Sequence, residues 1–284
     1  MNVGVATMID RATRIKLAAN QRNWDARAPI HVRSKFYGIG TRAPMSWFAP
    51  FEWRDLGHLE GRKVVHLQCH LGTETMAFAL KGACTTGLDF SGVSVQEAQR
   101  VASLAGLAIE YVHADLYDAV EALGTEHFDI VYTGKGALCY LPDLTAWAQT
   151  IARLLKPGGF LYLVEFHPLF NALGPTQTPG RSDDLVIRHD YLDGRGAIER
   201  ESSHTYTDGP ALGADTVHYE WPHGLGEVIT AIARTGFTVE SLTETCLLPW
   251  PRWPLMVRTD GGGWTMPESE PRFPLLYGLK ATKS

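Results

Sequence analysis

The sequence has few or none of three features that would each indicate a particular class of protein. It has only four cysteines, at positions 69, 84, 139 and 246, without the dense spacing of a secreted disulfide framework. It has no run of about eighteen apolar residues and no apolar signal segment near Met1. Its 26 basic residues are scattered and do not exceed the 31 acidic ones. We therefore expect a cytoplasmic protein that binds neither a membrane nor a nucleic acid.

The sequence divides into an aromatic and basic beginning and a longer, regularly alternating body. With 284 residues, the chain is long enough for one elaborated α/β domain with a smaller cap. Residues 1–60 show no strand pattern, and we expect a helical lid there. Residues 61–284 carry the main domain, with an inserted cap at about 168–222. In the insertion Gly, Pro, Asp and Thr separate short alternating runs, which predicts antiparallel strands.

The body of the chain alternates short apolar runs with segments of helical spacing, as a buried parallel sheet with crossover helices does. Lys156-Pro157-Gly158-Gly159 predicts a turn that ends a helix and precedes the fifth strand. The fold class we predict is α/β, with a mostly parallel, Rossmann-like seven-stranded sheet, helices on both faces, an N-terminal lid and the insertion after strand five. The expected strands are 63–68, 85–89, 109–113, 128–132, 160–166, 237–244 and 275–281, and the expected helices are 73–81, 94–105, 119–123, 144–155 and 226–234.

Three predicted strand ends carry residues suited to a nucleoside. Gly72 opens the first helix, where free N–H groups and a close backbone approach favour a ligand. Asp89 ends the second strand about twenty residues beyond the turn, a spacing that suits a carboxylate accepting from both ribose hydroxyls. Asp115 follows the third strand, where its carboxylate can accept from the exocyclic amine of adenine. Together the three strand ends predict an adenosine site.

At these residues the chain resembles the class I S-adenosylmethionine-dependent methyltransferases. Phe128-Asp129-Ile130-Val131-Tyr132-Thr133 is similar to the family's fourth motif, and Leu154-Leu155-Lys156-Pro157-Gly158-Gly159 to its turn before strand five. The resemblance implies that the turn ending at Gly72 holds the methionine part, Asp89 the ribose, and Asp115 with Leu116 the adenine. We include Phe90 and Thr133, which adjoin these strand ends, among the expected cofactor-binding residues.

The first motif departs from the family pattern. The family has an acid followed by Gly-x-Gly-x-Gly, whereas this chain has His66, Gln68, His70 and Gly72 and keeps only the last glycine. A bacterial subset of methyltransferases, often from actinomycetes, is similar in its Leu-Gln-Cys-His turn and its later Tyr-Glu-Trp-Pro-His segment. If the turn keeps its shape without glycine, we expect the Gln68 and His70 side chains to bond the amino-acid end of the cofactor.

Several of these residues also have simpler interpretations. Ligand-type side chains gather in His66-x-x-Cys69-His70, but no second pair follows downstream, so we expect no metal. Asp89 as a cap of the next turn and Asp115 as an ordinary loop acid remain alternatives. The aromatic loop with Trp250, Trp253 and Trp264 forms either a substrate wall or packing over the sheet.

The methyl acceptor is expected across the ends of strands four and five. His167 is our candidate general base, because a neutral imidazole can take a proton near pH 7. Its alternative role is to bond the following turn. Glu165 orients that ring or acts itself. In the lid, Tyr37 and Trp24 close over the methionine end or serve as packing. Further candidates are Tyr132, Thr133, Lys135, Tyr140, His204, His218, Glu220 and His223.

These features predict an enzyme that transfers a methyl group from S-adenosylmethionine to an O, N or C acceptor on a small-molecule metabolite, as a monomer or homodimer. Two alternatives stay open. A nicotinamide-dependent oxidoreductase would also use Asp89, but its pyrophosphate needs the glycines that this turn lacks. A non-catalytic S-adenosylmethionine-binding protein would explain the altered first motif.

Overall fold

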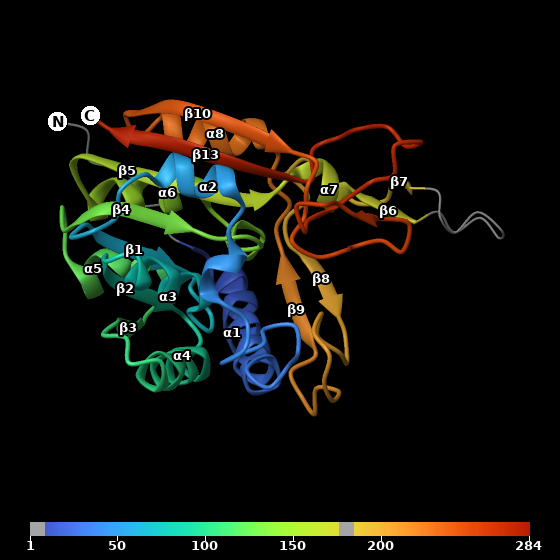
Figure 1. The fold of residues 1–284 in the computed structure, drawn as a ribbon, viewed down its shortest axis with the longest axis horizontal. Coiled ribbons are helices and arrows are strands. Elements are labelled where there is room, and N and C mark those ends of the chain that lie inside the picture. Colours follow the sequence, from blue (N-terminus) through green and yellow to red (C-terminus); the bar gives the residue numbers. More distant parts are fainter. Residues whose placement is uncertain (1–8, 176–184) are drawn as a thin grey trace.

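The computed structural model describes residues 9–175 and 185–284, and its centre is a seven-stranded sheet in the order β10-β13-β5-β4-β1-β2-β3 (Figure 1). The strands from β3 to β5 pair in parallel, whereas β13 lies antiparallel between β5 and β10. This confirms the predicted sheet. Its strands are β1 (Lys63–Leu67), β2 (Cys84–Asp89), β3 (Glu110–His113), β4 (Phe128–Thr133), β5 (Leu155–Phe166), β10 (Phe237–Thr245) and β13 (Leu276–Lys283).

Helices cover both faces of the sheet, and each face has its own apolar core. One core joins the sheet to α5 (Ala119–Leu123), α6 (Leu144–Leu154) and α8 (Leu225–Ala233). The other joins it to α2 (Pro50–Leu56), α3 (Thr73–Leu80), α4 (Gly92–Leu104) and part of the N-terminal segment. In such a doubly wound sheet the carboxyl ends of the parallel strands form the ligand crevice.

The structure corrects the predicted start of the fifth strand. Leu155 already pairs with Phe128, and the next pair joins Phe160 to Ile130. The four residues Lys156 to Gly159 therefore lie opposite Asp129 alone, as a bulge within β5 rather than a turn before it. Gly158 has φ +75°, which side chains other than glycine rarely adopt. Tertiary pairing on both sides of this bulge decides where the strand begins.

The N-terminal helix and the insertion pack against each other. The long helix α1 (Arg11–His31) lies beside β9, as Figure 1 shows. Asn20 donates from Nδ2 to the Tyr219 carbonyl at 2.8 Å and accepts from the Tyr219 N–H at 2.6 Å. The insertion holds α7 (Pro168–Ala172) and two antiparallel pairs, β6 (Leu173–Pro175) with β7 (Leu185–Ile187) and β8 (Ile198–Glu201) with β9 (Val217–Glu220).

The aromatic loop before β13 forms a third apolar cluster with α7. It contains the short pair β11 (Val257–Arg258) and β12 (Trp264–Thr265). Trp253 is buried in this cluster beside Phe170, whereas Trp250 faces the cavity described below. The loop thus provides both packing and a cavity wall. Residues 176–184 of the expected cap lie outside the described residues.

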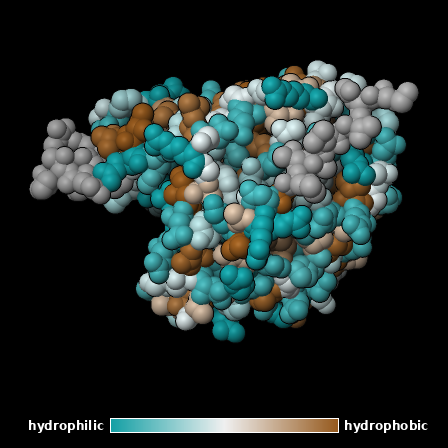
Figure 2. Space-filling view, turned by 180° about the vertical axis from the view of Figure 1, so that it is seen from behind, coloured by the Kyte–Doolittle hydropathy of each residue, from teal (hydrophilic) through white to brown (hydrophobic). Residues whose placement is uncertain are grey.

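The outer surface does not gather its apolar side chains into one broad area in the view of Figure 2, where hydrophilic and hydrophobic residues intersperse. Among residues 9–175 and 185–284, no helix combines the length and apolar character needed to cross a bilayer.

Candidate active site

A cavity of about 740 Å³ lies at the carboxyl ends of the parallel strands, beneath α1 and beside the insertion. Its size is within the range of small-molecule sites, and its position is the ligand crevice of a doubly wound sheet. The structure brings six of the predicted site residues together around it: Tyr37, Gln68, His70, Asp89, Phe90 and Glu165.

The turn between β1 and α3 keeps a glycine-like backbone without its glycines. Gln68, His70 and Gly72 have φ of 56°, 47° and 69°, all in the left-handed region. For a residue with a side chain this conformation costs roughly 1–2 kcal/mol. At Gly72 a Cβ would also collide with the Tyr111 hydroxyl. The three positions where the resembled family places glycine therefore retain the backbone shape that glycine serves.

Asp89 is buried at the end of β2 and braces this turn. Its Oδ2 accepts from the His70 N–H and its Oδ1 from the Ser91 N–H, both at 2.8 Å. Burial raises the pKa of this carboxyl to about 6, although the two N–H donors oppose the shift. Each oxygen keeps a further lone pair for another donor. The cap role and a ribose-binding role are thus compatible at the same carboxylate.

The two unusual side chains of the turn have different surroundings. Gln68 donates from Nε2 to the Ala137 carbonyl at 2.9 Å, while its buried Oε1 has no hydrogen-bond partner among the described residues. Both ring nitrogens of His70 are engaged, Nδ1 with Ser94 Oγ at 3.0 Å and Nε2 with His31 Nδ1 at 2.8 Å. Gln68 therefore retains an acceptor for a ligand, whereas His70 joins the turn to α1.

A histidine pair joins the lid, the turn and the insertion. His31 Nδ1 meets His70 Nε2, and His31 Nε2 lies 2.5 Å from Thr205 Oγ1 in the insertion. Burial, reinforced by the charge of Arg27, lowers the pKa of His31 to about 3. Burial also lowers the pKa of His70 well below its usual value. Both rings are therefore neutral at physiological pH, and the chain of contacts links α1 to the turn at residues 68–72 and to the insertion.

Aromatic rings surround this pair. Tyr37 stacks on His31 with ring centroids 5.3 Å apart and lies 2.5 Å from Tyr206 through the two hydroxyls. Trp24 packs edge-on against His70 at 4.9 Å. Tyr37 and Trp24 both line the cavity, so the lid contributes apolar walls next to the turn.

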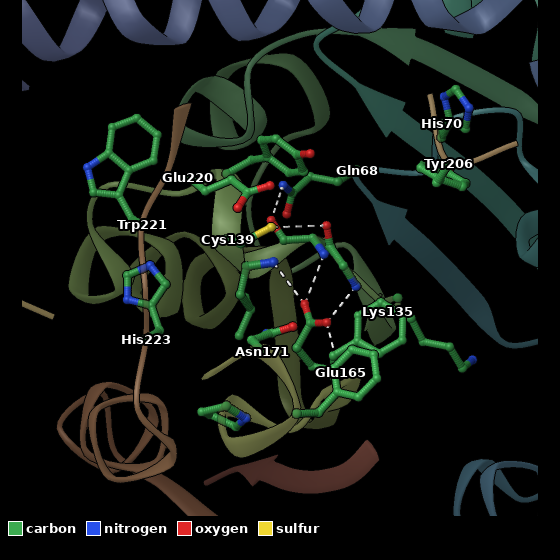
Figure 3. A pocket seen from close by; sticks show the side chains of 18 of the residues that line it. Gln68, His70, Lys135, Cys139, Glu165, Asn171, Tyr206, Glu220, Trp221 and His223 are labelled. Atoms are coloured by element: carbon green, nitrogen blue, oxygen red, sulfur yellow. Dashed lines mark hydrogen bonds between the residues drawn. The ribbon is translucent and has the colours of Figure 1, made fainter. Parts of the chain in front are cut away.

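The Glu165 carboxylate binds the backbone of the loop that follows β4. Its Oε1 accepts from the N–H groups of Gly136 (2.5 Å) and Phe166 (2.6 Å), as Figure 3 illustrates for this loop. Its Oε2 accepts from those of Ala137 (2.9 Å) and Leu138 (3.0 Å). Four N–H donors fill the usual capacity of a carboxylate. Glu165 therefore positions the loop to which Gln68 is bonded, and its geometry argues against the proton-transfer role.

His167 adopts the simpler of its two predicted roles. Its Nδ1 accepts from the Leu169 N–H at 3.1 Å as the N-cap of α7, and its Nε2 lies 2.9 Å from Glu244 Oε1. The side chain is buried and does not line the cavity. The geometry thus argues against His167 as the general base, because its Nδ1 caps α7 and the ring lies outside the cavity, where Nε2 has Glu244 near it but no hydrogen bond within the described residues.

The other predicted cofactor residues lie outside this cavity. Asp115 accepts from the Tyr117 N–H at 2.9 Å as the cap of a short helical turn. This agrees with the simpler interpretation of Asp115 as an ordinary loop acid. Leu116 packs in the core beneath α6. Thr133 is buried at the end of β4, and Gly72 contributes through backbone shape alone. An adenine-binding role for Asp115 and Leu116 stays a prediction.

The acceptor-side candidates are also divided. Lys135, Tyr140, Glu220 and His223 line the cavity, whereas Tyr132, His204 and His218 do not. Lys135 is paired with buried Glu52 at 3.2 Å. Burial would raise the pKa of Glu220, but its hydrogen bond with His218 and the charge of Arg200 hold that pKa below its usual value. Glu220 is therefore an ionised carboxylate in the cavity wall.

The polar face of α1 was not among the sites predicted from the sequence. Asn20, Asn23, Arg27 and His31 are all buried on that helix. Their spacing of three, four and four residues places them on one face, which a helical periodicity count of polar residues would have found. This face carries the contacts to β9 and to the turn at residues 68–72.

Comparisons with known proteins agree with this geometry. Residues 65–161 match a family model described as a methyltransferase domain. Ubiquinone biosynthesis O-methyltransferases are similar to this chain. The enzyme of Pseudomonas syringae pv. tomato is 30% identical, over 54% of this chain and 62% of the enzyme's length. That of Paracidovorax citrulli is 39% identical, over 39% of this chain and 46% of the enzyme's length. The chain thus spans less than two thirds of these relatives.

A solved structure supports the same fold. An S-adenosylmethionine-dependent methyltransferase from Mesorhizobium loti superimposes with a TM-score of 0.58 and 24% identity, covering 82% of this chain and 96% of its own. The chain therefore has the class I S-adenosylmethionine-dependent methyltransferase fold, with its methyltransferase domain matched at residues 65–161.

Proposed function

We propose that this protein binds S-adenosylmethionine in the crevice at β1 and β2 and transfers its methyl group to a small-molecule acceptor. The observation that carries the proposal is the left-handed backbone at Gln68, His70 and Gly72. Two of these residues bear the strain of a conformation that glycine adopts freely. A ligand that requires this backbone shape would explain why the turn keeps it although two of the residues carry side chains.

The residues around the turn fit such a cofactor. The remaining lone pairs of Asp89 suit the two ribose hydroxyls, and the N-terminus of α3 offers N–H groups to a carboxylate. Gln68 Oε1, which has no partner in the described part of the chain, suits the amino group of the methionine end. A nicotinamide cofactor is less well served, because its pyrophosphate needs glycines that the turn lacks.

When bound, S-adenosylmethionine supplies a methyl group that is already activated for displacement. The chain then has to position the acceptor and exclude water. Glu165 holds the loop 136–138 at the edge of the cavity, and α1 covers the turn. Neither predicted base is free: His167 lies outside the cavity and Glu165 has its oxygens filled. We infer that the protein acts mainly by orientation.

Cofactor titration tests the binding step. Isothermal calorimetry with S-adenosylhomocysteine should show binding to the wild type, and NAD should not bind. Asp89→Asn should weaken S-adenosylhomocysteine about tenfold, since a hydroxyl bonded to a carboxylate contributes more than one bonded to an amide. Asp260→Asn, at an exposed loop residue, is the matched control. Binding of NAD alone, or equal affinities of the wild type and Asp89→Asn, would overturn the proposal.

Two further measurements complete the test. Turnover on an acceptor panel separates an enzyme from a non-catalytic binding protein. If α1 and Tyr37 form a closing lid, S-adenosylhomocysteine should slow proteolysis within residues 20–41, and unchanged cleavage would argue against closure. We further propose a cytoplasmic location and a small, partly apolar metabolite as acceptor, supported by the free thiols of all four cysteines and the aromatic cavity walls.

A further inference from the structure

The end of the cavity formed by the insertion carries an uneven set of charges. Arg200, Glu220 and Arg252 all line it, together with His189. Arg200 Nε lies 3.3 Å from Glu220 Oε2, so these two charges compensate each other. His189 is close enough to both arginines that their charges, after burial, lower its pKa and favour the neutral ring. Glu220 also acts on Arg252, so one carboxylate faces two arginines and one positive charge is in surplus among the described residues at this end of the cavity.

The Arg252 side chain is held in place without an acidic partner. Its guanidinium lies over the Phe170 ring, 4.5 Å from the centroid, and 5.9 Å from that of Trp253. Within residues 9–175 and 185–284, no carboxylate lies within ion-pair distance of it, and its side chain makes no hydrogen bond. Stacking on a ring leaves the edge of a guanidinium and its N–H donors available for an oxygen pair.

Aromatic rings line the space beside this arginine. Phe166 and Phe170 are stacked at 5.0 Å with an interplanar angle of 18°, and Trp250 meets Phe166 edge-on at 5.7 Å. All three line the same cavity, as does Trp221. Such walls favour a planar apolar ring, because aromatic pairs stack or meet edge-on.

We propose that this end of the cavity binds an aromatic carboxylate, whose carboxylate is held by Arg252 and whose ring lies beside Phe166 and Trp250. The inference rests on the proposed function, since it names the class of the methyl acceptor. The ring would extend from Arg252 toward the loop 136–138 and Gln68, which line the same cavity. Figure 3 shows Gln68, Glu220 and Trp221 among the side chains that line the cavity.

A carboxylate fits this site better than a phosphate. Glu220 lines the same wall of the cavity, and Arg200 offsets its negative charge without exceeding it. Asp190 also lines the cavity and is paired with Arg195 at 3.3 Å. Because Arg200 and Arg195 offset these two carboxylates, one positive charge is in surplus, which a single negative charge matches and a dianionic phosphate exceeds.

Calorimetry with matched pairs of ligands tests this site. The probes are 4-hydroxybenzoate, 3,4-dihydroxybenzoate and 3-hydroxy-2-naphthoate, each beside its uncharged carboxamide, with phenyl phosphate as a further probe. Each is titrated with and without S-adenosylhomocysteine. At least one acid should bind about tenfold more tightly than its carboxamide, as expected for a charge-assisted bidentate contact. Arg252→Gln should remove that preference, and Arg258→Gln, at an exposed arginine of β11, should keep it.

The outcomes distinguish this inference from the function on which it rests. Equal affinities for acid and carboxamide, no binding of any acid, tighter binding of phenyl phosphate, or an unchanged preference in Arg252→Gln would each overturn the carboxylate site. If S-adenosylhomocysteine binds in those cases, the methyltransferase proposal stands. If the acids bind with the predicted preference but S-adenosylhomocysteine does not, the carboxylate site stands and the methyltransferase proposal fails.

Discussion

Acid should destabilise this protein through the buried pair of His31 and His70, and replacing His31 should remove a defined part of that sensitivity. His31 has no exposed surface, and its two ring nitrogens contact His70 and Thr205. His31→Gln removes the titrating ring while keeping a polar side chain. At pH 7.5 the variant should lose about 1–3 kcal/mol of unfolding free energy, because two buried contacts are disturbed.

The pH dependence has a sign and a size. Burial lowers the pKa of His31 from 6.5 to about 3, so the folded state stays neutral where the unfolded state takes up a proton. The stability is therefore fully present above pH 6.5 and is lost as the pH falls from 6.5 through about 3. At pH 5 the solution is about 1.5 pH units below the pKa of His31 in the unfolded state. At about 1.36 kcal/mol per unit, protonation of the unfolded state lowers the free energy of unfolding by about 2 kcal/mol for His31 alone.

Urea unfolding at pH 7.5 and 5.0, at constant ionic strength, measures this contribution. The wild type should lose about 2 kcal/mol more than His31→Gln between the two conditions. His58→Gln, whose side chain is 81% exposed, should behave like the wild type. If His31→Gln loses as much stability as the wild type on acidification, His31 is not a neutral buried ring and the reasoning fails.

Two further substitutions test the cofactor turn and its supporting loop. Gly72→Ala should lower the free energy of unfolding by at least about 2 kcal/mol, because it adds a collision with Tyr111 to the strain of positive φ. The control Gly106→Ala, with φ +68° and open space around the new Cβ, should lose only about 1–2 kcal/mol. Equal losses in thermal or urea unfolding would refute the collision. Glu165→Gln should destabilise by about 3 kcal/mol and weaken the binding of S-adenosylhomocysteine, since an amide leaves two of the four bound N–H groups, three of which belong to the loop, without an acceptor. Unchanged calorimetric affinity would show that the loop does not support the turn at residues 68–72.

The sequence determined the sheet and the place of the crevice. Apolar runs with helical segments between them are local patterns, and they located β1 to β5, α8, β10 and β13 to within a few residues. The exception was the start of β5, where residues 156–159 bulge inside the strand. Gln68, His70 and Asp89 were identified from their positions relative to those elements, and the structure gathers them around one cavity.

Only the tertiary structure decided what each side chain does. His31 meets His70 across 39 residues, and Arg252 approaches Phe170 across 82, so no local pattern joins them. Likewise His167 caps α7 instead of entering the cavity, because the chain turns at Pro168 and Glu244 approaches from β10. Secondary structure follows from periodicity along the chain, but the charge and hydrogen-bond partners of a buried residue depend on segments that meet only when the chain has folded.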